Sequence, residues 1–339
     1  MTTPMLDLLH DCDPGNDDAL AILAALGHPA VRLLAVTTGA GHLASDRTAI
    51  NAAITVAAAH PLVAPVCEGS VGPLLRERLI ARILDMESAL DPARDDLARV
   101  ELDPQHSVDR IAAEAAAHPG LTIVATGPLT NLALALRRHP RIQPLIGRIV
   151  TLSGAWGLGT KTAAAEWNIL CDPEAAAIVY GSGIALTMVP VDASGTVPIT
   201  HALIDRVAAL PAPAAKLAAE LLASLRATHR PNILTPTEAP LHDPCAVLVA
   251  AQPGIAKTVR ARVDVETSPG LNYGRTVVDF LGRSDKPTNC DVVIEFDIEA
   301  TQEALFASIA SIAALQRGDV EAGSIIPAAH QTKQQQGTR

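Results

Sequence analysis

The sequence predicts an α/β protein in which one domain is built on a mostly parallel sheet with helices on both faces. In the first two-thirds of the chain, short apolar runs alternate with longer alanine-rich stretches, a pattern typical of parallel strands joined by crossover helices. Apolar residues make up 49% of the 339 residues, which is enough for a large buried core. No stretch rich in proline, glycine and serine divides the chain, so we expect a single domain.

The elements of the N-terminal two-thirds alternate strictly. Strands are expected at Met5–Cys12, Arg32–Thr38, Ala64–Glu68, Leu121–Gly127, Arg148–Ser153 and Ala185–Val189. Helices are expected at Asp17–Gly27, His42–His60, Ser107–His118, Leu129–Arg138 and Pro173–Tyr180. Ser107 and Asp172 are the predicted N-caps of their helices, and Pro173 suits a first helical position because it needs no N–H partner there. Repeated strand–helix units of this kind form a Rossmann-like sheet.

The C-terminal third changes character. Residues 199–253 are predicted to be mostly helical, followed by strands at Val259–Glu266, Arg275–Phe280 and Asp291–Asp297 and by a closing helix from Thr301. The end of the chain turns polar. We therefore expect the domain to occupy residues 1–317 and residues 318–339 to form a disordered tail.

Composition restricts the function. The formal charge of −10 argues against binding nucleic acid polymers or anionic membranes, so any partner should be a small molecule. The five cysteines are scattered with no C-x-x-C pair, which argues against both a disulfide framework and a thiolate zinc site. No secretory signal pattern is visible, so the expected location is cytoplasmic.

Four aspartates cluster directly after the first predicted strand, at Asp11, Asp13, Asp17 and Asp18. Asp11 and Asp13 share one strand face, while Asp17 and Asp18 fall in the first turn of the next helix. A helix N-terminus stabilises an anion by only about 0.3–1 kcal/mol, too little to hold four carboxylates together in a shielded crevice. They must share protons or bind a cation. An all-oxygen ligand set suits Ca²⁺ or Mg²⁺.

Two other interpretations of the aspartates are possible. They could be a solvated, capped helix start, which is the usual role of a single aspartate there but does not account for four. A phosphotransferase of the haloacid-dehalogenase type also places two aspartates like Asp11 and Asp13 after its first strand. Gly15 stands where that class has Thr or Val, and no matching lysine motif follows.

Several separated segments resemble one family, the inosine–uridine nucleoside hydrolases. They are Asp11–Ala19, Val124–Asn131, Ala165–Asn168, Cys171–Ala176 and Leu241–Ala246, and the likeness extends from about residue 6 to residue 306. Each segment alone is a weak signal, but all five in order are specific. The resemblance implies an enzyme that hydrolyses the N-glycosidic bond of ribonucleosides with a bound Ca²⁺, releasing ribose and a free base.

The resemblance also implies residue roles. Asp13, Asp18 and Asp243 would hold Ca²⁺ by their carboxylates and Thr126 by its main-chain carbonyl, with Asp11 supporting them. Asp17, Glu166, Asn168 and Asp243 would hydrogen-bond the ribose hydroxyls. Asp13 would act as general base toward water, and His242 would donate a proton to the departing base or orient it. Trp167, between two ribose-binding positions, is interpreted as core filler.

Three positions depart from the family pattern. His42 and Thr160 stand where asparagines are common, and Asp85-Met86-Glu87 replaces a usual His-Gly-Glu run. His42 and Thr160 can still hydrogen-bond a substrate, with different reach. Aromatic residues that could stack on a base are also scarce, with three Phe, two Tyr and two Trp in the whole chain.

Two functions remain open on the sequence alone. The first is the ribonucleoside hydrolase, as a homodimer or homotetramer. The second is a catalytically weak nucleoside-binding or sensory protein on the same fold. The departures at His42, Thr160 and Asp85 favour the second. The first is favoured by the intact Asp13, Asp18, Asp243 and His242.

Overall fold

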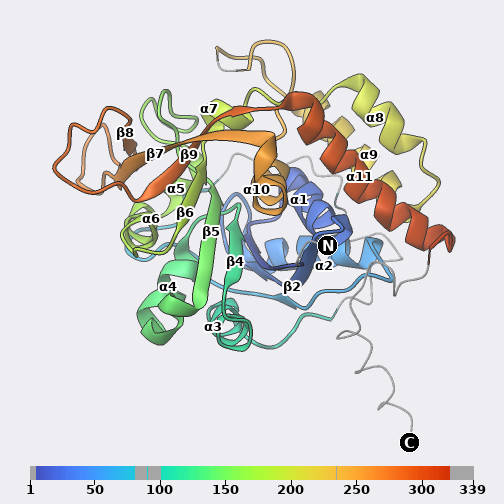
Figure 1. Ribbon diagram of the computed structural model, residues 1–339, viewed down its shortest axis with the longest axis horizontal. Coiled ribbons are helices and arrows are strands. Elements are labelled where there is room, and N and C mark those ends of the chain that lie inside the picture. The colour runs from blue at the N-terminus through green and yellow to red at the C-terminus, as the bar shows by residue number, and fades with distance from the viewer. Residues whose placement is uncertain (1–4, 81–89, 91–100, 234, 321–339) are drawn as a thin grey trace, which may run out of the picture.

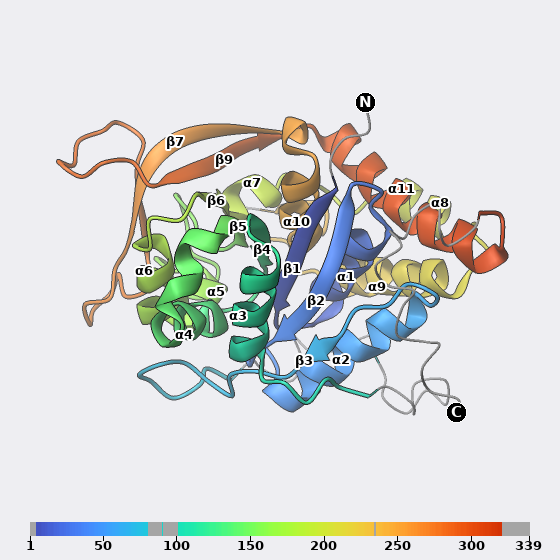
Figure 2. The ribbon, with the colours of Figure 1, turned by 60° about the horizontal axis from the view of Figure 1, so that its bottom comes forward.

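The computed structural model describes residues 5–80, 90, 101–233 and 235–320 (Figure 1). Two features of the sequence therefore lie outside the described residues: the Asp85-Met86-Glu87 segment and all of the polar tail beyond residue 320. Within the described part, one central sheet runs through the molecule, and helices pack on both of its faces, as Figure 2 also shows. The predicted α/β class is confirmed.

Within the described residues the sheet has nine strands in the order β3-β2-β1-β4-β5-β6-β9-β7-β8. The first seven strands in this order, from β3 to β9, pair in parallel. Strand β7 runs antiparallel to β9, and β8 runs antiparallel to β7. Their bounds are β1 Leu6–Cys12, β2 Val31–Thr38, β3 Val66–Cys67, β4 Leu121–Ala125, β5 Ile146–Leu152, β6 Leu186–Val189, β7 Ala256–Val265, β8 Thr276–Asp279 and β9 Cys290–Phe296. Strand β1 thus lies between β2 and β4, and the carboxyl ends of all three meet at one edge.

Two hydrophobic cores explain why the strands read as continuous apolar runs. On β1, Leu8 belongs to one core and Leu9 to the other, because successive side chains of a strand point to opposite faces. The first core is covered by α1 Asn16–Gly27, α2 Ser45–Ala58, α8 His201–Ala208, α9 Pro213–Thr228, α10 Asp243–Ala251 and α11 Ile298–Arg317. The second is covered by α3 Ser107–Ala117, α4 Thr130–Arg138 and α6 Pro173–Tyr180. Short elements complete the chain: α5 Trp167–Cys171, α7 Val191–Ser194, η3 Pro140–Leu145 and η4 Pro253–Ile255.

Several predicted boundaries are wrong for local reasons. Ser107 does not cap α3: His106 is the cap, its Nδ1 accepting from the Val108 N–H at 3.2 Å, while the Ser107 hydroxyl donates to the Cys67 carbonyl at 2.8 Å. The closing helix begins at Ile298 rather than Thr301, because Asp297 caps it. Asp172 caps α6 as predicted, accepting from the Ala175 N–H at 3.0 Å.

Within the described residues, α11 is the one helix whose length and apolarity would allow it to cross a membrane. Its buried side chains include Leu305, Ile309 and Ile312, and they join the core formed with α1 and α9. In this fold the apolar stripe of α11 is therefore covered by protein.

Candidate active site

The site begins where β1 ends, and Asp11 is its most deeply fixed carboxylate. Asp11 is buried, and its Oδ1 accepts from the Thr37 hydroxyl at 2.7 Å and from Asn131 Nδ2 at 2.9 Å. Burial raises the pKa of Asp11 to about 7, although these two hydrogen bonds oppose the rise. Thr37 comes from β2 and Asn131 from α4, after β4, so the neighbours of β1 in the sheet hold the carboxylate in place.

Asp13 lies between two glycines and a histidine. The His42 backbone N–H donates to Asp13 Oδ2 at 2.9 Å, and His42 Nδ1 lies 3.3 Å from the same oxygen. A Cβ on Gly41 would fall 1.9 Å from Asp13 Oδ2, and one on Gly127 would fall 2.7 Å from Oδ1. Only glycines let both loops approach this carboxylate, so its orientation is defined from two sides.

Three further carboxylates converge beside it. Asp17, Asp18 and Asp243 each offer an oxygen, and the three oxygens lie within 4.8 Å of one another. Burial, and secondarily the neighbouring carboxylates, raises the pKa of Asp18 and Asp243 well above the usual range. No lysine or arginine in the described part of the chain forms a salt bridge with these three aspartates, so they require shared protons or a cation. Asp13 contributes charge here but belongs to no cluster as tight as this one within the described residues.

The sequence predictions missed His10, which lies behind the cluster. Burial lowers the pKa of His10 to about 3, so its imidazole is neutral and carries one N–H. The Thr126 hydroxyl donates to Asp18 Oδ1 at 2.7 Å, which leaves its oxygen to accept from His10 Nε2 at 2.9 Å. This chain of hydrogen bonds fixes Asp18. Nothing in the sequence marks His10, because the partner of its ring lies 116 residues away on β4's carboxyl end.

The Thr126 carbonyl and the turn into α5 complete one wall. Asn168 Nδ2 donates to the Thr126 carbonyl at 2.7 Å and to that of Leu152 at 3.1 Å. Glu166 caps α5: its Oε1 accepts from the Asn168 N–H, and its Oε2 accepts from the N–H groups of Gly154 and Ile169. Burial raises the pKa of Glu166, and these backbone donors oppose the rise. Both side chains are buried and rigidly held.

His242 lies at the start of α10, next to Asp243. Its Nδ1 is 2.7 Å from the Ser194 hydroxyl, a partner on α7 that the sequence did not suggest. Burial lowers the pKa of His242. The Ser194 contact leaves Nε2 as the ring nitrogen available to a substrate.

His42 and Thr160, the two described departures from the family pattern, meet at Trp167. The rings of His42 and Trp167 stack with centroids 4.2 Å apart and planes 14° apart. Thr160 is an exposed loop residue, and its hydroxyl accepts from the backbone N–H of Trp167 at 3.3 Å. Trp167 is buried, as expected of a residue that fills the core. Core filling alone does not account for its stack on His42.

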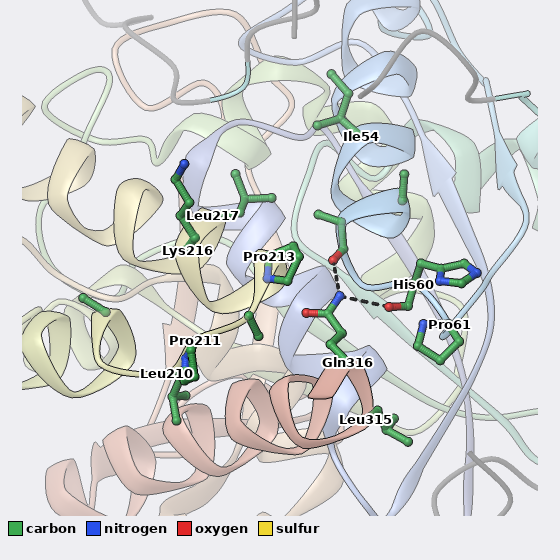
Figure 3. Close-up of a pocket in the computed structure, with 14 residues that line it drawn as sticks. Ile54, His60, Pro61, Leu210, Pro211, Pro213, Lys216, Leu217, Leu315 and Gln316 are labelled. Atoms are coloured by element: carbon green, nitrogen blue, oxygen red, sulfur yellow. Dashed lines mark hydrogen bonds between the residues drawn. The ribbon is translucent and has the colours of Figure 1, made fainter. Parts of the chain in front are cut away.

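A separate cavity of about 1010 Å³ is lined by none of these carboxylates (Figure 3). It is formed by the end of α2, the α8–α9 connection and the end of α11, with Pro61, Leu210 and Leu315 among its walls. Gln316 crosses it and donates to the carbonyls of Ala58 and His60. None of the predicted site residues lines it. The converging carboxylates at the carboxyl ends of the strands form the candidate active site.

Fold and site together define a class: an α/β protein that gathers buried carboxylates at the carboxyl edge of a parallel sheet. The family model for inosine-uridine preferring nucleoside hydrolase matches residues 8–303, and the chain belongs to this family. It is a ribonucleoside hydrolase, an enzyme acting on N-glycosyl compounds.

Relatives support the same conclusion. The chain is 40% identical over 307 residues to a pyrimidine-specific ribonucleoside hydrolase of Shewanella sp. (strain MR-4), covering 89% of this chain and 96% of the relative. It is 39% identical over 304 residues to the enzyme of the same name from Salmonella arizonae, covering 88% and 97%. Among solved structures, a plant nucleoside hydrolase matches with a TM-score of 0.81 at 27% identity, covering 90% of this chain and 99% of the other. A purine-preferring ribonucleoside hydrolase from Gardnerella vaginalis matches with a TM-score of 0.81 at 27% identity, covering 91% and 99%.

Proposed function

We propose that the enzyme uses Ca²⁺ to hydrolyse the N-glycosidic bond of ribonucleosides, giving ribose and a free base. The observation that carries this proposal is the convergence of half-buried Asp17 with buried Asp18 and Asp243, which have no cationic side-chain partner in the described part of the chain. The donor set is all oxygen, which fits a hard cation. Asp13, Asp18 and Asp243 would hold Ca²⁺ with their carboxylates and Thr126 with its carbonyl. When bound, the cation would lower the pKa of a water molecule.

In this proposal Asp13 is the general base. A base must lie in a fixed position to take a proton from water efficiently, and Gly41, Gly127 and His42 hold this carboxylate on both sides. Asp11 supports the neighbouring backbone from its bonds to Thr37 and Asn131. Positive charge that develops on the ribose ring would be stabilised by the surrounding carboxylates.

The ribose hydroxyls would be bound by Asp17, Glu166, Asn168 and Asp243, with His42 and Thr160 nearby. Asn168 Nδ2 already donates hydrogen bonds to two carbonyls, so Oδ1 is the atom left to accept from a hydroxyl. Glu166 Oε1 accepts one backbone N–H and Oε2 accepts two. Oε1 therefore has room for one more donor, which we assign to the 5′-hydroxyl.

His242 would act on the leaving base. Ser194 fixes the imidazole through Nδ1, so Nε2 would give or share a proton with the departing base. For the base itself we propose pyrimidines, because the relatives that share 39–40% identity with this chain are named pyrimidine-specific.

The test measures reducing-sugar release from uridine, cytidine, inosine and adenosine, alongside thermal shifts with the same compounds. We expect release with uridine and cytidine that requires added Ca²⁺ and disappears in Asp13→Asn. Lys257→Met, which removes an exposed charge on β7, is the matched control and should retain activity. Thermal shifts without sugar release would instead favour the catalytically weak nucleoside-binding protein.

We also propose that the enzyme is a homodimer or homotetramer. Strand β8 is the edge strand of the sheet. The loops before and after it expose Leu271 and Leu281, with 96% and 77% of their surface accessible. Such apolar exposure at a sheet edge suits a second copy of the chain. Light scattering should give a mass at least twice 35.2 kDa, and a monomer would refute this part of the proposal.

A further inference from the structure

The contact between His42 and Trp167 reaches directly to the proposed base. The imidazole lies almost flat on the indole, with planes 14° apart, while its Nδ1 is 3.3 Å from Asp13 Oδ2. About half of the His42 side chain is exposed, and its ring rests on the indole of Trp167. The orientation of His42 toward Asp13 therefore depends on Trp167.

Trp167 is itself held by ring contacts and by its backbone. Lys161 Nζ lies 4.6 Å from the centroid of the indole, and the Thr160 hydroxyl accepts a hydrogen bond from the backbone N–H of Trp167. The buried Nε1 atom has no hydrogen-bond partner among the described residues. A buried donor without a partner costs free energy, which a phenylalanine ring at this position would avoid. The flat surface of the indole, rather than its N–H, is the feature that the neighbouring residues use.

Trp167 also lies between two residues of the proposed ribose site. It is the first residue of α5, with Glu166 as the cap before it and Asn168 after it. Asn168 is bonded to the Thr126 carbonyl, so this single turn contacts the proposed cation ligands on one side and His42 on the other. Movement of the indole would therefore displace both the Thr126 contact and the His42 ring.

We propose that Trp167 is a positioning residue for the hydrolysis: its indole holds the His42 ring against Asp13 and so keeps the general base in register with the ribose. This inference rests on the proposed function, since it assigns a role within the same site. It also joins the two described departures from the family pattern, because His42 and Thr160 contact the same tryptophan. Thr160 hydrogen-bonds the backbone of Trp167, and His42 stacks on its indole.

The first experiment is a double-mutant cycle on sugar release with Ca²⁺ present. Trp167→Leu removes the flat ring and should lower kcat by about 10–10²-fold, the loss expected when a reacting group shifts by up to an ångström, with a much smaller change in KM. Trp167→Phe keeps a ring for stacking and should restore most of kcat. His42→Ala should give a loss similar to that of Trp167→Leu. The double variant should be no worse than the poorer single variant, because both act through one contact.

The second experiment needs neither cation nor substrate. The chain has two tryptophans, so Trp156→Phe leaves Trp167 as the fluorophore. In that background, His42→Ala should uncover one face of the indole and increase quenching by acrylamide. Arg230→Ala is the control and should leave quenching unchanged, because Arg230 is exposed and its guanidinium bonds the carbonyls of Thr228 and His229.

The outcomes separate this inference from the proposed function. Turnover by the unchanged protein combined with additive losses in the cycle, or with unchanged quenching in His42→Ala, would overturn the role of Trp167 alone. A loss confined to KM would overturn it as well, since it would indicate simple substrate contact. Absence of turnover by the unchanged protein would overturn the proposed function and, with it, this role.

Discussion

The position of Asp13 gives the sharpest test of the site, through Gly41. A methyl group at this position would lie 1.9 Å from Asp13 Oδ2, whereas ordinary contact begins at 3.4 Å. The carboxylate must therefore move by about 1.5 Å, or the loop must retreat by as much. Because misplacing a reacting group by 1 Å costs about 10²-fold in rate, Gly41→Ala should lower kcat for uridine by at least about 10²-fold.

Two other glycines make a graded series with it. In Gly127→Ala the new Cβ would lie 2.7 Å from Asp13 Oδ1, so a smaller loss is expected. In Gly254→Ala it would meet nothing within 4 Å, so kcat should be unchanged. The assay is reducing-sugar release, with circular dichroism and Tm measured on each variant to separate lost activity from lost folding. A folded Gly41→Ala with the kcat of the unchanged protein would refute the argument, as would equal losses in all three variants.

Three further predictions concern the substrate and the core. Uridine should be hydrolysed far faster than uridine 5′-monophosphate, because the phosphate removes the hydroxyl donor for Glu166 and adds charge beside buried aspartates; comparable kcat/KM values would exclude the Glu166 assignment. His242→Ala should slow uridine by about 10²–10⁴-fold but an activated aryl riboside much less, and equal losses would indicate that His242 only orients the substrate. Ile309→Ala, at a fully buried position of α11, should cost about 2–5 kcal/mol in the free energy of unfolding, whereas Ser311→Ala, at a half-exposed position of the same helix, should cost little; equal denaturation midpoints would show that α11 is not packed in the core.

The sequence alone determined most of the secondary structure and part of the site. Parallel strands buried on both faces must be continuous apolar runs, so β1 and β2 could be placed within one residue, and β4 ends two residues earlier than predicted. Helix ends were less accurate, because caps such as His106 and Asp297 depend on one side-chain hydrogen bond. The aspartates at the end of β1 were recognisable because four acids around one turn have no ordinary structural explanation.

Only the tertiary structure decided which distant groups surround those aspartates. The order β2-β1-β4 brings Thr37, Thr126 and Asn131 to the end of β1, yet strand order is fixed by packing over the whole chain and leaves no local pattern. His10 and Ser194 were missed for this reason, since each is an ordinary residue until its partner arrives. The stack of Trp167 on His42 joins segments 125 positions apart, and its value comes from the distance and angle between two rings, which residue types at a given spacing do not encode.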